Sequence, residues 1–265
     1  MLNRCSGCWN VQHWMHERLG ARVRRITLVM MTLALAGVVA SGCGGGKKIV
    51  QNGEELSVNQ DLYLKAVSLQ HKQDYFNALH AWDDVIKDEP RFGMAHFNKG
   101  LCYDWMNFVP EAMAEYEAAR RWDPKNTLIL NNLGAIYLRA DNKLAAALDT
   151  LKEALDLDAY RPSIHYNLAA AYLQSKEFDK AVVHADVAVD LVAAPSKESE
   201  NGLHKTVDLR QLATYLLRQA ECHIERGEME KARAALERVE KQCREKVPAD
   251  LWARVGPAEA PKPNG

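Results

Sequence analysis

Two cysteines near the start of the chain, Cys5 and Cys8, have the C-x-x-C spacing at which thiolates bind zinc or form a redox-active pair. A structural zinc site needs four ligands. The nearest candidates, His13 and His16, follow the cysteines too closely for a finger-like site. The pair also lies upstream of a segment with the features of a cleaved signal peptide. We therefore expect neither a metal nor a redox site there.

Histidines recur further along the chain at positions that could suggest a second kind of metal site. His96 and His165 occupy equivalent positions of a repeated pattern. We interpret this position as one that packs between helical hairpins, rather than as a ligand pair. The sequence contains no glycine-rich phosphate loop, no G-x-S-x-G and no H-E-x-x-H. We therefore predict a protein that is not an enzyme and that carries no cofactor or metal.

Three further cysteines, Cys102, Cys222 and Cys243, are candidates for a disulfide if the protein is exported. Cys222 and Cys243 fall in one predicted hairpin but about ten residues out of step around its turn near Gly227. At 1.5 Å per residue this is roughly 15 Å, whereas bridged Cα atoms lie within about 7 Å. We predict free, largely buried thiols.

An export signal is indicated by the stretch from Arg24 to Lys48. Two arginines precede an apolar run, Ile26–Ala40, and small residues follow it. The run is about fifteen residues long, whereas a spanning helix needs about twenty. A positive segment, a short apolar segment and small residues are typical of a secretory signal peptide. Met15 is an alternative start, because residues 1–14 are an unusual beginning for such a signal.

The residues "VASGC" that end at Cys43 resemble the lipobox of bacterial lipoproteins. The resemblance implies cleavage before Cys43 and lipid attachment to it. By the sorting rule known for such lipoproteins in double-membraned bacteria, a residue other than Asp after the cysteine, here Gly44, implies a location on the periplasmic face of the outer membrane. The alternatives are an ordinary secreted protein cut nearby, or an uncleaved anchor. The glycines and lysines that follow predict a flexible tether over 43–58.

The charge balance argues against nucleic-acid binding. The whole chain has a formal net charge of −1, and no cluster of lysine and arginine follows Lys48. Affinity for phosphate backbones requires such clusters. We therefore expect a protein or peptide partner of unknown identity, and a membrane contact made through the lipid anchor.

The rest of the chain is organised by a repeat with a period near 34 residues. Small residues, aromatic positions and a closing proline recur together. They are seen at Gly100 and Gly134, at Tyr103 and Tyr137, and at Pro90 and Pro124. Apolar residues recur at spacings of three and four, as in amphipathic helices. Because one hairpin cannot bury its apolar face alone, neighbouring repeats must stack. No strand is expected.

This pattern resembles the tetratricopeptide repeat (TPR), which implies an all-α fold, an α-α superhelix of about five helical hairpins. The predicted parts are a signal peptide over 1–42, a lipidated cysteine and tether over 43–58, a TPR domain over 59–246, and a short cap and disordered tail over 247–265. The repeats are placed near 59–92, 93–126, 127–161, 162–195 and 213–246, with an irregular joint over 193–208.

The resemblance implies that binding takes place in a concave groove lined by the first helix of each hairpin. Asn98, Asn132 and Asn167 fall at one groove position in three consecutive repeats; we call them the asparagine ladder. An asparagine amide offers both a donor and an acceptor, so the ladder could hold the backbone of an extended segment. It could equally tie neighbouring helices together. The other predicted groove residues are Tyr63, Phe97, Trp105, Tyr166 and Arg139. Arg139 stands almost alone as a basic residue, which disfavours a carboxylate clamp.

The expected function is a membrane-anchored adaptor that binds a protein segment and supports assembly of an envelope complex. The architecture resembles the small TPR lipoproteins of pilus assembly, including pilotins. Alternatives are a scaffold that docks envelope hydrolases or proteases, and a subunit of an enzyme complex. A homodimer through the terminal hairpin is a further possibility, which would require an exposed apolar patch around Leu212, Leu216 and Trp252.

Overall fold

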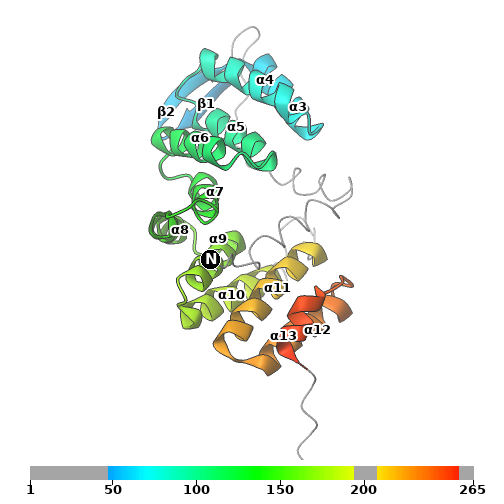
Figure 1. Cartoon of the computed structure of the whole chain (residues 1–265). Helices are drawn as coiled ribbons and strands as arrows, with labels where there is room; N and C mark the ends of the chain where they lie inside the picture. Colours follow the sequence, from blue (N-terminus) through cyan, green and yellow to red (C-terminus); the bar gives the residue numbers. More distant parts are fainter. Residues whose placement is uncertain (1–46, 194–207, 257–265) are drawn as a thin grey trace, which may run out of the picture. The chain divides into compact units, whose positions relative to one another are not determined.

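The computed structural model describes residues 47–193 and 208–256 (Figure 1). The predicted signal peptide over 1–42, Cys43, most of the 193–208 joint and most of the predicted tail lie outside these ranges. Within them, the chain folds into two short strands followed by eleven helices. The described part divides into two compact units, of which the first ends at Met106 and the second begins at Asn107.

The helices follow one another in pairs, as the repeat predicts, and the all-α class is confirmed. Their bounds in the first unit are α3 (Gln60–His71), α4 (Tyr75–Asp88) and α5 (Gly93–Trp105). In the second unit they are α6 (Val109–Trp122), α7 (Thr127–Tyr137), α8 (Leu144–Leu157), α9 (Pro162–Gln174), α10 (Phe178–Ala193), α11 (Leu209–Arg226), α12 (Met229–Lys241) and α13 (Ala249–Val255).

A β-hairpin precedes the first helix, so the prediction of a flexible tether is wrong for residues 47–58. Strands β1 (Lys47–Gln51) and β2 (Glu54–Val58) pair in antiparallel register. The turn residues Asn52 and Gly53 have φ values of 52° and 82°. Asn-Gly accepts this left-handed backbone at low cost and favours a two-residue hairpin. The turn of the hairpin is therefore encoded locally, by the Asn52-Gly53 dipeptide.

The hairpin packs on the first helical pair. Leu56 and Val58 of β2 are buried in one apolar cluster with Trp82 of α4 and Phe92, which precedes α5. The side chain of Gln51 closes the other side, because it donates to the carbonyl of Arg91 and accepts from the amide of Gly93. Strand, α4 and the α4–α5 turn are thus fixed to one another within the first unit.

The small residue of each repeat allows close helix packing in the second unit. Gly134 of α7 faces Leu151 of α8, and a Cβ atom at position 134 would lie 2.5 Å from the Leu151 Cγ atom. Ala169 of α9 and Ala220 of α11, at the equivalent positions, have no exposed surface. The repeat thus needs a small side chain here for steric reasons, since cores at this density do not absorb an added methyl group.

Prolines mark helix ends and starts as expected. Pro90 follows the end of α4, and Pro124 follows the end of α6. Pro110 and Pro162 lie instead in the first turns of α6 and α9. Proline suits a first turn because its missing N–H would have no partner there.

The short helix α13 packs against the terminal hairpin α11–α12. Trp252 of α13 donates from Nε1 to Glu240 of α12 over 3.1 Å and packs against the apolar cluster of the hairpin. Leu212 and Leu216 of α11 are fully buried in that cluster. The exposed apolar patch that a dimer through these two leucines would need is therefore not present, because α12 and α13 cover them.

Candidate functional site

Two members of the asparagine ladder have their amide orientation fixed by their own helix. The Nδ2 atom of Asn98 lies 2.8 Å from the carbonyl oxygen of Met94, and that of Asn132 lies 2.8 Å from the carbonyl oxygen of Leu128. A carbonyl oxygen only accepts, so the amide nitrogen must face the helix. Oδ1 is then the atom left for a ligand. These positions offer an acceptor, rather than the donor and acceptor expected from the residue type.

The third member, Asn167, ties two helices together. Its Nδ2 atom on α9 donates to Oδ1 of Asn131 on α7 over 2.9 Å. Asn131 is only 8% exposed, so this bond satisfies an acceptor that has little access to water. Of the two roles left open for the ladder, the helix tie is thus observed at Asn167. The other role, holding the backbone of an extended segment, remains available to Asn98 and Asn132.

Arg218 of α11 occupies the ladder position in the last repeat. It stands two residues before Ala220, the offset that separates Asn132 from Gly134. Its guanidinium lies 5.0 Å from the ring centroid of Tyr166 on α9 and donates to the Tyr166 hydroxyl over 3.3 Å. Arg218 was missed in the sequence because an arginine breaks the asparagine pattern, although the offset alone identifies it.

A buried ion pair holds Arg218 in place. Nη1 lies 2.8 Å from Oε2 of Glu221, and both side chains are 15% exposed. Burial raises the pKa of Glu221, while the neighbouring Arg218 cation lowers it. The Tyr166 ring also makes an edge contact with Tyr215 of α11, with centroids 5.0 Å apart. α9 and α11 are therefore joined by the cation–π contact, hydrogen bond and ring contact of Tyr166 instead of by an asparagine.

The other predicted groove residues divide between core and surface. Phe97 is 1% exposed, so its side chain offers almost no surface to a ligand and its assignment to a groove lining is wrong. Tyr63 is partly buried against Trp82, with ring centroids 5.6 Å apart. Trp105 is 43% exposed and stacks on Tyr75, with centroids 6.4 Å apart. It is the aromatic member of the first unit that a ligand could contact.

Arg139 does not stand free either. It lies just beyond the end of α7, and its Nη2 atom donates to Oδ1 of Asn107 over 2.7 Å. The bond links the region just before α6 to the region just after α7.

His165 on α9 contacts a second histidine, His184 on α10. His165 is 7% exposed, its Nε2 atom contacts the carbonyl of Ala159, and its Nδ1 atom lies 3.0 Å from Nδ1 of His184. The Ala159 carbonyl only accepts, so Nε2 of His165 carries the N–H of the neutral ring. Nδ1 of His165 is then an acceptor, and Nδ1 of His184 donates to it. Burial, and then the nearby His165, lowers the pKa of His184 to about 4. In the described residues no group of three or more metal-ligating side chains forms.

The free cysteines follow the prediction. Cys102, Cys222 and Cys243 are buried and unbridged. Burial raises the pKa of Cys102 and of Cys222 to about 12. A thiol becomes a nucleophile by losing its proton, so neither is activated for chemistry.

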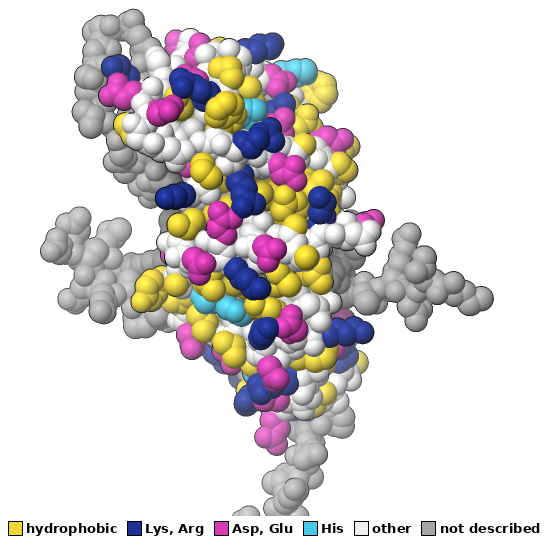
Figure 2. Space-filling view, turned by 90° about the vertical axis from the view of Figure 1, so that its left-hand side faces the viewer, with side chains coloured by type: hydrophobic (Ala, Val, Ile, Leu, Met, Phe, Trp, Pro, Cys, Tyr) yellow, Lys and Arg dark blue, Asp and Glu magenta, His cyan; other side chains and the backbone are white. Residues whose placement is uncertain are grey.

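Charged side chains of both signs are mixed on one face of the molecule (Figure 2). On the face shown in Figure 2, lysine and arginine alternate with aspartate and glutamate among scattered apolar side chains. Within 47–193 and 208–256, no helix has both the length and the apolar character needed to cross a bilayer. This face therefore shows no basic patch of the kind that nucleic acid requires.

Comparison with known families agrees with the repeat. Family models described as tetratricopeptide repeat match residues 106–162, 138–190 and 214–244. Together they cover all or most of each helix from α6 to α12 in the second unit. The first helical pair lies outside the matched ranges, although α3 and α4 pack as a hairpin.

Among curated proteins, similarity is limited to short parts of long chains. The chain is 26% identical over 135 residues to the probable UDP-N-acetylglucosamine–peptide N-acetylglucosaminyltransferase SPINDLY of Hordeum vulgare, covering 48% of this chain and 14% of that one. It is 36% identical over 93 residues to the cell division cycle protein 27 homolog A of Arabidopsis thaliana, covering 32% and 12%. The matched stretches span 12 to 15% of these relatives' length.

Two solved structures share the fold over most of the chain. One is TTC0263, a thermophilic TPR protein of Thermus thermophilus, with a TM-score of 0.54, 19% identity, and coverage of 74% of this chain and 96% of that one. The other is PilW, described as a widely conserved type IV pilus biogenesis factor, with a TM-score of 0.60, 18% identity, and coverage of 73% and 82%. At these identities the likeness concerns the fold alone.

Proposed function

Since the chain is a tetratricopeptide repeat protein, we propose that it is a non-enzymatic adaptor. It binds an extended protein segment on the faces of its first helices and is anchored to a membrane through lipid on Cys43. In this proposal the adaptor supports assembly of an envelope complex, such as a pilus or a secretion machine. TPR folds generally serve as protein-interaction scaffolds, which is the part that the family supports directly.

The observation that carries the proposal is the fixed amide orientation of Asn132 in the second unit, which recurs independently at Asn98 in the first unit. Each amide uses its donor on its own helix, at 2.8 Å, and keeps Oδ1 for a ligand. No described residue donates to either oxygen. An acceptor held in this way suits the N–H groups of an extended backbone, as in recognition of segments through their main chain. The side chains lose little additional entropy on binding, because their rotamers are already set.

The neighbouring repeats supply contacts of another kind. Tyr166 is partly buried beneath the Arg218 guanidinium, whose side chain is 15% exposed and paired with Glu221. Tyrosine is enriched among the residues that contribute most to interface affinity. We assign to Tyr166, held in place by Arg218, a contact with partner side chains, and to Asn132 the contact with the partner backbone.

Two arguments support the envelope location and role. The apolar run that ends in "VASGC" at Cys43 supports lipid attachment. Similarity of fold to PilW, described as a pilus biogenesis factor, supports a role in assembly of a surface structure. Since the second argument rests on fold, the partner has to be identified by experiment.

The test is a crosslinking pull-down from native membranes. Wild type is compared with a double variant, Asn98→Ala and Asn132→Ala, and with a control, Asn77→Ala. Asn77 lies on α4, a second helix, and is exposed. The proposal expects a partner captured by wild type and control and lost by the double variant. Its identity would distinguish pilus assembly from docking of hydrolases. Equal capture by all three would exclude the asparagines as the binding site.

A further inference from the structure

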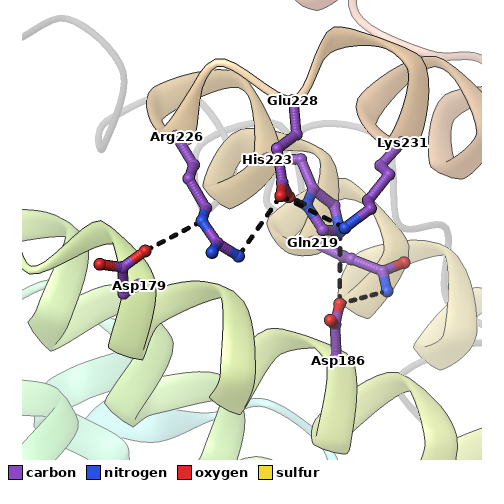
Figure 3. A network of polar contacts seen from close by, with 7 residues as sticks. All are labelled: Asp179, Asp186, Gln219, His223, Arg226, Glu228 and Lys231. Atoms are coloured by element: carbon purple, nitrogen blue, oxygen red, sulfur yellow. Dashed lines mark hydrogen bonds and ion pairs between the residues drawn. The ribbon is translucent and has the colours of Figure 1, made fainter.

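A single histidine lies between two carboxylates where the last repeat meets the fourth. The Nδ1 atom of His223 on α11 lies 2.7 Å from Oε2 of Glu228, which precedes α12. Its Nε2 atom lies 3.3 Å from Oδ1 of Asp186 on α10. The His223 side chain is only 4% exposed. Figure 3 shows the ring between the two acidic side chains, within a larger polar network.

This geometry determines the protonation of the ring. Ionised carboxylates only accept hydrogen bonds, and a neutral imidazole has one N–H. Both nitrogens of His223 can donate only when the ring carries two protons and a positive charge. A neutral ring would place a lone pair against one of the carboxylates.

The surrounding groups keep both carboxylates ionised. Asp186 also accepts from Nε2 of Gln219 over 2.7 Å. Glu228 lies 3.4 Å from Nη1 of Arg226 and 3.2 Å from Nζ of Lys231. The pKa of Glu228 is lowered, chiefly by the hydrogen bond from His223. Neither acid is therefore suited to hold the second proton in place of the ring.

The charged groups near His223 can be named by element. α10 contributes Asp186, and Asp179, which pairs with Arg226 over 2.9 Å. The α11–α12 segment contributes Arg226, Glu228 and Lys231. From the cap α13, Arg254 pairs with Glu225 of α11. α9 contacts α11 through Tyr166, which meets Arg218.

His223 lies at a point where the regular repeat is interrupted. Residues 194–208 separate α10 from α11, whereas four residues connect α4 to α5, α6 to α7 and α8 to α9. The same offset from the small residue gives tyrosine in other repeats, at Tyr103, Tyr137 and Tyr172. In the last repeat a titratable cation replaces a neutral ring. The contact between α10 and α11 therefore depends on side chains more than on a short connection.

We propose that His223 is a proton-dependent clasp: in its doubly protonated form it holds the terminal hairpin α11–α12 against α10, and loss of one proton at alkaline pH weakens that contact. The clasp consists of His223, Asp186 and Glu228. It is a property of the fold and does not depend on what the first helices bind.

The direction of the pH effect follows from linkage. Hydrogen bonding to Asp186 is the largest influence and raises the pKa of His223 above its ordinary value of 6.5; the bond to Glu228 adds to this, against burial. The folded state then binds the proton more tightly than the unfolded state. The contribution to stability is complete below pH 6.5 and is lost as pH rises through the folded value. Each unit by which that value is raised corresponds to a tenfold larger opening constant at high pH.

The direct test is ¹⁵N–¹H NMR of the histidine rings in the purified full chain. At pH 6.5 and somewhat above it, both nitrogens of His223 are expected to carry protons, with a titration midpoint above 6.5. Asp186→Asn should lower that midpoint. A single neutral tautomer at pH 6.5, or a midpoint at or below 6.5, would overturn the proposal without any variant having to fold.

Hydrogen exchange then tests the mechanical part. After correction for intrinsic rates, exchange between pH 6 and 9 is expected to rise more in α11–α13 than in α7–α8, tenfold for each unit by which folding raises the pKa of His223. His223→Gln should exchange fast in α11–α13 already at pH 6 and show no further rise. The control is His71→Gln, an exposed histidine of α3, which should keep the wild-type profile. A wild-type pH profile in His223→Gln, or a uniform rise over all helices, would refute the clasp.

Discussion

The Nδ2 atom of Asn132 donates to the carbonyl oxygen of Leu128, one turn earlier in α7, whereas Nδ2 of Asn167 donates to Asn131 on a different helix. Residues at equivalent positions of two adjacent repeats thus have different partners. Sequence equivalence does not imply functional equivalence here. The two asparagines can be separated by mutation.

Asn132→Ala and Asn167→Ala are expected to affect different properties, partner capture and stability respectively. Asn167→Ala removes the donor from Asn131, an acceptor that is only 8% exposed. It should therefore lower the free energy of unfolding by about 1–3 kcal/mol. Asn132→Ala should weaken partner capture and leave stability almost unchanged. Urea unfolding and the pull-down measure the two effects, and a large stability loss in Asn132→Ala would contradict the assignment.

Gly134→Ala is expected to destabilise the α7–α8 hairpin. The added Cβ atom would lie 2.5 Å from the Leu151 Cγ atom. Overpacking of this kind costs about 1–3 kcal/mol. Urea unfolding measures it. The double variant with Leu151→Ala should lose less than the sum of the single variants, because the truncation makes room. Additive losses would mean that the two side chains do not meet.

Leu56→Ala tests whether the β-hairpin is part of the folded domain. Leu56 is 2% exposed and packs with Trp82. Truncation of such a leucine costs about 2–5 kcal/mol. The control is Val50→Ala in β1, where the side chain is 69% exposed. Thermal unfolding should show a lower midpoint for Leu56→Ala only. Equal midpoints for the two variants would mean that the hairpin contributes nothing to the core.

His184 predicts a loss of stability in acid. Its pKa is lowered to about 4 by burial and by His165. Between pH 6.5 and about 4 the unfolded state therefore binds more protons, and stability falls as pH falls through this range. His184→Gln should flatten the curve of unfolding free energy against pH, while His71→Gln should not. An unchanged slope in His184→Gln would contradict the lowered pKa.

Cys43→Ser tests the membrane anchor that we propose. The variant is expected to move from the membrane fraction to the aqueous fraction, and mass spectrometry should find acyl chains on wild type only. Several acyl chains hold a protein on a membrane almost permanently, since each buried CH₂ adds about 0.8 kcal/mol. A variant that stays in the membrane fraction would favour an uncleaved apolar anchor instead.

The sequence predicts the helical part of the fold well, because the repeat encodes it several times. Gly134 and Ala169 mark close contacts, and Pro90 and Pro124 mark helix ends, each at the same place in the period. Their physical roles are local, steric and conformational. The hairpin at 47–58 is not predicted, because the glycine-rich stretch after the predicted anchor indicates a flexible tether. The Asn52-Gly53 pair nevertheless indicates a turn.

The candidate site was less predictable, since it depends on contacts between repeats. Phe97 is core because of what surrounds α5, and no spacing rule distinguishes it from a lining residue. The tie between Asn167 and Asn131 needs the distance between two helices. Arg218 and His223 depart from the repeat pattern. They take part in a stacked ion pair and a charged cluster that a consensus of small and aromatic positions does not contain.

The start of β1 at Lys47 limits how far the domain can move from an anchor on Cys43. Four residue steps span at most about 14 Å of extended chain. This connecting segment is shorter than the first helix. A lipid on Cys43 would therefore confine the first repeat to the headgroup layer and its immediate vicinity. Partners already in that membrane would then be met by diffusion in two dimensions, at a raised local concentration.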